Sequence, residues 1–170
     1  ASDSDDSHSR AVSIRSAGAF YLIARAVFLL DQLSKHTIQS FMNPGQQIPV
    51  LGQVMSLHLR FNTGAAWGIL AGQTMWLSII GGVMLLALLV SGAWAGRMAR
   101  PMRIGLPLLA GGAAGNLFDR LHKGAVLDFI DFHVWPVFNV ADIAIVCGCF
   151  IICYHLIAIE ARSCSQEEST

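Results

Sequence analysis

Four long apolar segments set the strongest limit on how this chain can fold. An α-helix needs about 20 apolar residues to cross the roughly 30 Å hydrocarbon core of a bilayer. Of the 170 residues, 54% are hydrophobic and 13% are charged, whereas a soluble domain usually carries about a quarter charged residues. The sequence therefore predicts an all-α polytopic membrane protein with four transmembrane helices, at about residues 18–36, 69–95, 104–121 and 137–159.

The charges between these segments predict their orientation. The short connection "GRMARPMR" carries Arg97, Arg100 and Arg103, and positively charged short loops remain in the cytoplasm. An even number of spans then places both termini in the cytoplasm as well. We expect a disordered, acidic cytoplasmic tail at residues 1–17, a membrane domain at residues 18–160 and a cytoplasmic C-terminal tail at residues 161–170. A net charge of zero argues against nucleic acid as a partner.

The longer extracytoplasmic segment, at about residues 37–68, has a period of two in part of its length. In "VMSLHLRFN", apolar residues from Met55 to Phe61 alternate with polar residues from Ser56 to Asn62. Strict alternation is typical of a half-buried strand. We therefore expect a small extracytoplasmic β-sheet, a cradle that rests on the membrane surface.

The unusual polar residues collect at the extracytoplasmic ends of the predicted spans. Asp142 lies at the mouth of the fourth apolar segment. A carboxylate at the centre of a bilayer would cost about 2.5–3.5 kcal/mol. The others are Asp31, Lys35, Asn116, Asp119, Arg120, Asp128, Asp131 and Asn139. Polar residues scattered at random would not collect at one interface, and ionisable residues inside membranes commonly belong to functional sites.

Two carboxylates held close in a low-dielectric site cannot both ionise easily, so one keeps its proton at neutral pH. Such a pair is what an aspartic peptidase uses to activate water and to polarise the scissile carbonyl. Spacing alone offers Asp128 with Asp142 as one pair, and Asp119 or Asp131 with Asp142 as competitors. Ion pairs of these aspartates with nearby lysines and arginines remain an alternative at this point.

Other chemistries lack their motifs. The sequence has no H-E-x-x-H for zinc and no G-x-S-x-G for a serine nucleophile, and we expect neither a metal nor another cofactor. A small proton- or ion-coupled transporter is the main alternative function, because carboxylates inside membranes also mark ion pathways. Transporters usually place their sites near the bilayer midplane, between structural repeats, whereas these charges collect at one interface.

Five sequence blocks resemble the lipoprotein signal peptidases (signal peptidase II), which are four-span bacterial aspartic peptidases. In the family's order they are "DQLSK" at 31–35, "NTGAAWG" at 62–68, "GGAAGNLFDR" at 111–120, "VLDFID" at 126–131 and "FNVAD" at 138–142. The resemblance implies cleavage of diacylglyceryl-modified prolipoproteins before the lipidated cysteine. It also implies a monomer in the bacterial inner membrane, with its active site near the extracytoplasmic interface, and sensitivity to the inhibitor globomycin.

The resemblance also implies roles for individual residues. The catalytic aspartates would be Asp128 and Asp142, with Asp119 in support. Phenylalanine usually follows "GAA" in the family, whereas Trp67 stands here, which affects only the gate over the site. The residues implied to bind substrate or to support the site are Asp31, Lys35, Asn62, Gly64, Ala66, Asn116, Asp119, Arg120 and Asn139.

Overall fold

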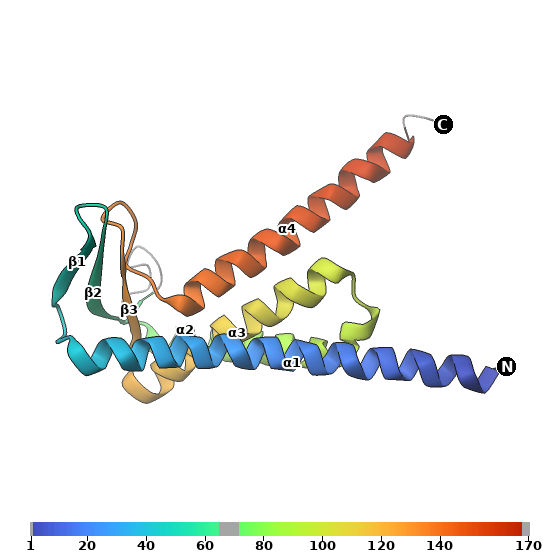
Figure 1. The fold of residues 1–170 in the computed structure, drawn as a ribbon, viewed down its shortest axis with the longest axis horizontal. Helices are drawn as coiled ribbons and strands as arrows, with labels where there is room; N and C mark the ends of the chain where they lie inside the picture. The colour runs from blue at the N-terminus through green and yellow to red at the C-terminus, as the bar shows by residue number, and fades with distance from the viewer. Residues whose placement is uncertain (1, 65–71, 168–170) are drawn as a thin grey trace.

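The structure is a computed structural model that describes the backbone of residues 2–64 and 72–167 and the side chains of residues 13–64 and 72–163. Figure 1 shows a group of long helices with a small sheet at one end. The elements, in chain order, are α1 (Ser2–Phe41), β1 (Gln47–Leu51), β2 (Met55–Asn62), α2 (Thr74–Ser91), the 3-10 helix η2 (Gly92–Arg97), α3 (Arg100–Lys123), β3 (Val126–Asp131) and α4 (Val140–Glu167).

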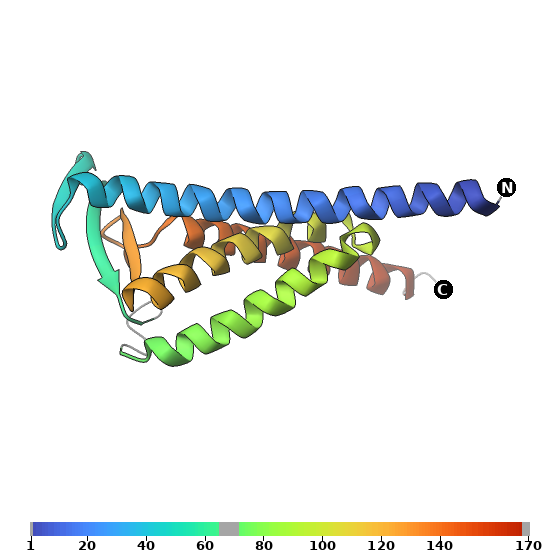
Figure 2. The same ribbon diagram turned by 90° about the horizontal axis from the view of Figure 1, so that it is seen from below.

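Three segments of the described chain are long and apolar enough to cross a membrane: Ser13–Phe41, Thr74–Arg97 and Val140–Ser163. The predicted third span corresponds to α3, which is a helix but does not reach this hydropathy. Its position explains its composition, since α3 contacts α1, α2 and α4 (Figure 2). A helix surrounded by other helices can carry polar and small residues on buried faces, which lowers its mean hydropathy.

Glycines on α3 allow its neighbours to approach closely, as the G-x-x-x-G spacing predicts. A β-carbon at Gly111 would overlap the backbone of α1 at Ala24, and one at Gly112 would overlap the backbone of α4 at Ala141. A β-carbon at Gly115 would overlap the carboxylate of Asp31. Any larger residue at these positions would push α3 away from α1 or α4.

The ends of the helices differ from the predicted boundaries. Helix α1 begins at Ser2, so the backbone predicted as a disordered tail is helical here. An acidic stretch is compatible with this, because negative charge near a helix N-terminus interacts favourably with the helix dipole. Helix α4 begins at Val140, three residues later than predicted, and continues to Glu167. The predicted start of the second span, at residues 69–71, lies outside the described residues.

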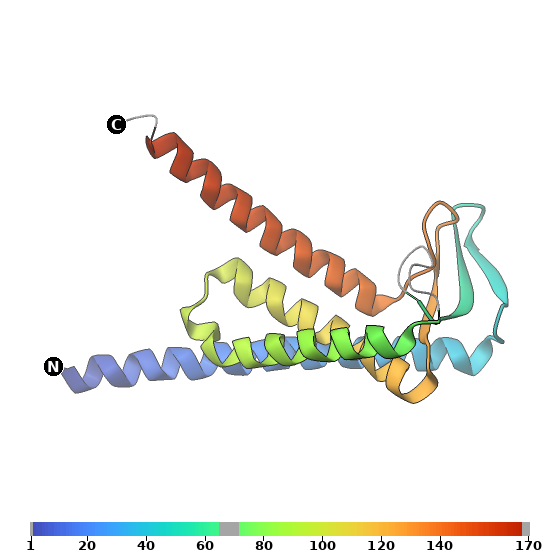
Figure 3. The ribbon, with the colours of Figure 1, turned by 180° about the vertical axis from the view of Figure 1, so that it is seen from behind.

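The three strands form one antiparallel sheet in the order β1-β2-β3. A turn at residues 43–46 precedes β1, where Gly45 has a φ of 81°. Leu59, Leu127 and Phe129 of the sheet pack against Ile38 and Met42 near the C-terminal end of α1. This apolar cluster fixes the sheet across the ends of the helices (Figure 3).

The predicted strand around residues 54–62 is β2, but its alternation is interrupted. Leu59 is buried as expected, whereas Phe61 is exposed and Ser56 is buried. The pairing of β2 with β3 shifts register between Leu57 and Arg60, and a bulge of this kind changes which face each side chain occupies.

Candidate active site

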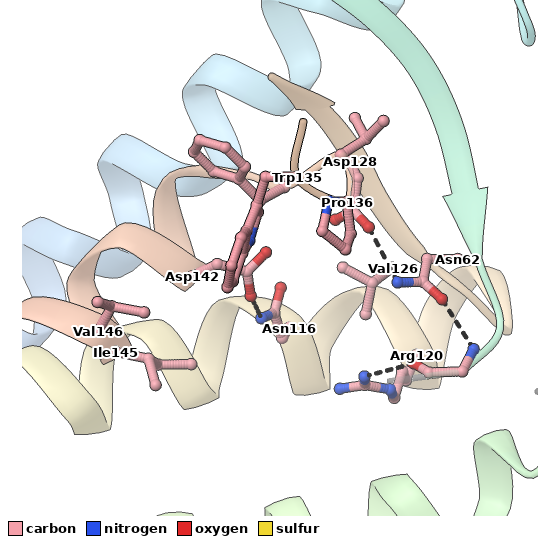
Figure 4. A pocket seen from close by; sticks show the side chains of 13 residues that line it. Asn62, Asn116, Arg120, Val126, Asp128, Trp135, Pro136, Asp142, Ile145 and Val146 are labelled. Atoms are coloured by element: carbon pink, nitrogen blue, oxygen red, sulfur yellow. Dashed lines mark hydrogen bonds between the residues drawn. The ribbon is translucent and has the colours of Figure 1, made fainter. Parts of the chain in front are cut away.

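The unusual polar residues meet where the sheet joins the helix ends, as their positions in the sequence predict. Asp31 and Lys35 come from α1, Asn116 from α3 and Asp142 from α4, while Asp128 comes from β3. Figure 4 shows Asp128 and Asp142 facing a common pocket, with Asn62, Asn116 and Arg120 around it. This carboxylate pocket has a volume of about 220 Å³.

Asp128 is held by two side-chain amides. Its Oδ1 accepts a hydrogen bond from Asn139 Nδ2 at 2.7 Å, and its Oδ2 accepts one from Asn62 Nδ2 at 3.0 Å. Asn62 is held in turn because its Oδ1 accepts from the Gly64 amide at 2.9 Å. The side chain of Asp128 therefore has a fixed orientation, with 3% of the residue exposed.

Asp142 and Asn139 form a reciprocal cap at the start of α4. Asp142 Oδ2 accepts from the Asn139 backbone amide at 3.1 Å, and Asn139 Oδ1 accepts from the Asp142 amide at 3.0 Å. This is a capping box in which the first and fourth residues satisfy each other's amides. The cap explains why α4 begins at Val140, and it connects both aspartates through the single side chain of Asn139.

Asn116 connects this pair to a buried ion cluster. Its Nδ2 donates to Asp142 Oδ1 at 2.7 Å, and its Oδ1 accepts from Lys35 Nζ at 3.3 Å. Lys35 Nζ also lies 2.7 Å from Asp31 Oδ2 and 2.8 Å from Asp119 Oδ2. Because Lys35 approaches the oxygen of Asn116, the amide nitrogen is directed toward Asp142.

The structure separates the alternative partners of Asp142 from the pocket. Asp119 is fully buried and contacts Lys35 and Lys123, so its surroundings are those of an ion pair. Asp131 contacts His58 and His133. Neither Asp119 nor Asp131 lines the carboxylate pocket, whereas Asp128 and Asp142 both do.

The remaining predicted residues lie at the rim or beyond the described chain. Arg120 lines the pocket and donates from Nη2 to the Gly64 carbonyl at 3.3 Å. Ala66 and Trp67 lie outside the described residues. Within residues 13–64 and 72–163, no three His, Cys, Asp or Glu side chains form a group that could hold a metal ion.

The segment before α4 forms a wall of the site that was not predicted from the sequence. Trp135, Pro136, Val137 and Phe138 all line the carboxylate pocket. The available signal was their position, because they directly precede the Asn139 that was itself predicted to lie in the site.

Two apolar grooves open beside Asp142. The outer groove, of about 450 Å³, lies between α4 and the segment that precedes it, with Phe132, Trp135 and Val146 in its walls. The inner groove, of about 620 Å³, lies between α2, α3 and α4 and includes Leu88 and Leu117. Asp142 lines both grooves as well as the carboxylate pocket.

The pocket favours a protonated form of Asp128. Burial, and next the negative charge of Asp142, raise the pKa of Asp128 to about 7, although the amides of Asn62 and Asn139 and the charge of Lys35 oppose the shift. Two interacting carboxylates titrate as a pair. A single proton is therefore available to the pair near neutral pH.

The chain is similar to known proteins of one family. The protein-family model described as signal peptidase (SPase) II matches residues 23–158 of the chain. The chain belongs to the signal peptidase II family. It is 42% identical over 142 residues to a lipoprotein signal peptidase of Moorella thermoacetica, covering 81% of this chain and 92% of that one. A lipoprotein signal peptidase of Bacillus velezensis is 38% identical over 143 residues, covering 81% and 93%.

Solved structures are similar over most of the chain. One, described as a bacterial membrane enzyme, has a TM-score of 0.78 and 33% identity and covers 85% of this chain and 91% of its own. A second with the same description has a TM-score of 0.71 and 34% identity, covering 82% and 92%. The chain is therefore a peptidase of the bacterial membrane with a fold already seen in such enzymes.

Proposed function

We propose that this protein is an aspartic endopeptidase that removes signal peptides from diacylglyceryl-modified prolipoproteins, cutting before the lipidated cysteine. The observation that carries the proposal is the pair of aspartates in one pocket. Within the described residues, every hydrogen-bond donor to the Asp128 and Asp142 carboxylates is an amide. Amide donors fix the two side chains but do not compensate their negative charge, so the two carboxylates share one proton.

The reaction proceeds by activation of water. The ionised carboxylate of the pair removes a proton from a water molecule, which attacks the scissile carbonyl carbon. The protonated carboxyl donates a hydrogen bond to the carbonyl oxygen and stabilises the charge that develops there. When the tetrahedral intermediate collapses, the C–N bond breaks and the leaving amine takes a proton from the pair.

The asparagines and the arginine have distinct roles in this scheme. Asn62 and Asn139 hold Asp128, and Asn116 holds Asp142, so that both carboxylates keep the geometry that the attack needs. Arg120, next to Gly64 at the rim of the carboxylate pocket, holds the backbone of the substrate. Asp31, Lys35 and Asp119 support Asn116 and the start of α4 from behind.

The grooves support a lipid-linked substrate. Each is apolar and each reaches Asp142, so acyl chains and an apolar signal peptide can remain in hydrocarbon while the scissile bond enters the carboxylate pocket. Because the acyl chains lie in hydrocarbon both before and after binding, the lipid contributes mainly by keeping the substrate in the bilayer beside the pocket. A soluble peptide of the same sequence would lack this contribution.

The arrangement of the termini supports the proposed topology. The start of α1 and the end of α4 lie at the same end of the molecule, opposite the sheet (Figure 1). With α3 as the fourth membrane helix, residues 18–160 form the membrane domain and both termini are cytoplasmic. The carboxylate pocket then lies near the extracytoplasmic interface, where a lipidated cysteine presents its peptide bond.

The proposal is tested by incubating purified protein in detergent with a diacylglyceryl-modified prolipoprotein and with the same precursor without lipid. We expect cleavage before the modified cysteine in the first case only, and its loss in Asp142→Asn. Cleavage of both precursors at equal rates would contradict the role of the lipid. Absence of cleavage by folded wild-type protein on lipidated precursors would contradict the proposal and favour ion transport.

A further inference from the structure

The carboxylate of Asp131 joins three parts of the chain and does not line the carboxylate pocket. Asp131 is the last residue of β3, and its Oδ2 lies 3.1 Å from Nδ1 of His58 on β2. Its Oδ1 accepts from the His133 backbone amide at 2.8 Å and lies 3.4 Å from His133 Nδ1. Asp131 is 7% exposed, so these contacts satisfy a carboxylate that has little access to water.

The contacts of Asp131 fix an unfavourable backbone conformation. His133 has a φ of 63°, and no other non-glycine residue of the described chain has a positive φ. A side chain with a β-carbon rarely adopts this region unless the surrounding structure imposes it. The hydrogen bond from the His133 amide to Asp131 closes this turn.

The turn begins a loop, residues 132–137, that is closed tightly at its base. Phe138 and Ile130 exchange backbone hydrogen bonds at 2.8 and 3.0 Å, and the ring of Phe138 stacks on that of Phe132 at 5.9 Å. Beyond this base, Trp135 lines both the carboxylate pocket and the outer groove. The path of the loop therefore decides where the wall between the pocket and the groove lies.

We propose that Asp131, with His58 and His133, positions this loop so that Trp135 forms the surface on which the lipid-linked substrate binds. Asp131 is a positioning residue in this proposal, because it acts through the loop and does not line the carboxylate pocket. The inference rests on the function proposed above. It assigns a role to Asp131, which had been a competing candidate for the catalytic pair.

The role predicts a change in KM without a matching change in kcat. In Asp131→Ala the turn at His133 loses its acceptor, and we expect KM for the lipidated precursor to rise about tenfold with kcat within about twofold. Asp131→Asn keeps one acceptor oxygen and is expected to fall between Asp131→Ala and wild type. His58→Ala, which removes only one contact, should raise KM less than Asp131→Ala does.

Glu160→Ala provides the matched control, since it removes an exposed carboxylate near the far end of α4 and should leave KM and kcat unchanged. A variant that merely unfolds would lose active protein, which lowers Vmax and leaves KM unaltered, so kcat is calculated per folded molecule. Wild-type KM in folded Asp131→Ala would overturn the proposal. A fall in kcat at constant KM would also overturn it, because Asp131 would then contribute to the chemistry.

A second measurement does not depend on cleavage. Val134 is 87% exposed, so a nitroxide on Val134→Cys, with the four native cysteines changed to serine, reports on the mobility of the loop. We expect a narrower spectrum in Asp131→Ala than in its Asp131 parent. An unchanged spectrum would contradict the positioning role, whereas an inactive wild type with a mobile Asp131→Ala loop would contradict only the proposed function.

Discussion

Two pairs of aspartates lie at the same end of the helices, and their neighbours differ; all four are buried except Asp142, which is half-buried. Asp31 and Asp119 both contact the ammonium group of Lys35, at 2.7 and 2.8 Å. In the described chain, Asp128 and Asp142 receive hydrogen bonds from amides and from no cation. A cation bonded to both carboxylates compensates their charge, whereas amide donors leave two like charges that are relieved by sharing a proton.

The difference in neighbours gives the two pairs different roles, because Asp31 and Asp119 support the structure of the site whereas Asp128 and Asp142 carry out the chemistry. Asp31, Lys35 and Asp119 form the Lys35 cluster, which reaches the active pair of Asp128 and Asp142 through Asn116. Asp31 also accepts a hydrogen bond from the Ala141 amide, in the first turn of α4, at 3.0 Å. Changes in the Lys35 cluster should therefore act mainly on stability, and changes in the Asp128–Asp142 pair mainly on turnover.

The largest expected effect on stability comes from Lys35→Met. This change leaves the buried Asp31 without its ion pair and leaves Asp119 with only the partly exposed Lys123, and breaking a buried ion pair typically costs about 3–5 kcal/mol. Thermal unfolding in detergent measures the loss. Lys123→Met is the matched control, because the Lys123 side chain is 30% exposed and an exposed pair contributes about 1 kcal/mol or less. Equal losses in the two variants would contradict the assigned role of Lys35.

A smaller effect is expected from Gly115→Ala. The added methyl group would displace the Asp31 carboxylate, and overpacking of this kind costs about 1–3 kcal/mol. Gly81→Ala on α2 is the control, since no atom lies within 4 Å of a β-carbon there. Alanine is favoured over glycine in a helix by about 1 kcal/mol, so Gly81→Ala should be neutral or slightly stabilising. Destabilisation by both variants to the same extent would contradict the packing account.

The pH dependence is expected to be smaller still, and it belongs to the active pair. The pKa of Asp128 is raised from 3.8 to about 7, first by burial and then by Asp142. A raised carboxyl pKa contributes stability that is fully present below pH 3.8 and is lost as the pH rises through about 7. Unfolding of wild type and Asp128→Asn from pH 4 to 8 measures this, and the slope should be shallower in the variant.

The same proton predicts the pH profile of activity. The scheme needs one protonated carboxyl, so kcat/KM should fall as the pH rises above about 7. A profile that stays flat from pH 6 to 9 would contradict the shared proton.

Much of this architecture can be predicted from the sequence because the signals are local. Apolar length predicts the membrane helices, and the glycines at 111 and 115 predict close contacts of α3. The start of α4 could also have been predicted, since Asn139 and Asp142 have the spacing of a capping box.

The composition of the active pair depends on non-local contacts. Asp131 is separated from the pocket because β3 pairs with β2, a contact between segments far apart in the sequence. Asp119 is separated from the pair only by its contact with Lys35, which lies 84 residues earlier in the sequence. Local spacing cannot reveal such a contact before the helices are packed.

The most direct test of the different roles of the two aspartate pairs uses Asp128→Asn and Asp119→Asn. Cleavage of a lipidated precursor and thermal unfolding are both measured for each variant. The account predicts that Asp128→Asn is folded, at least as stable as wild type near pH 7, and reduced in kcat by about 10³-fold or more. Asp119→Asn should be less stable but should retain cleavage per folded molecule within about tenfold. Full activity in a folded Asp128→Asn variant, with loss of turnover in a stable Asp119→Asn variant, would contradict it.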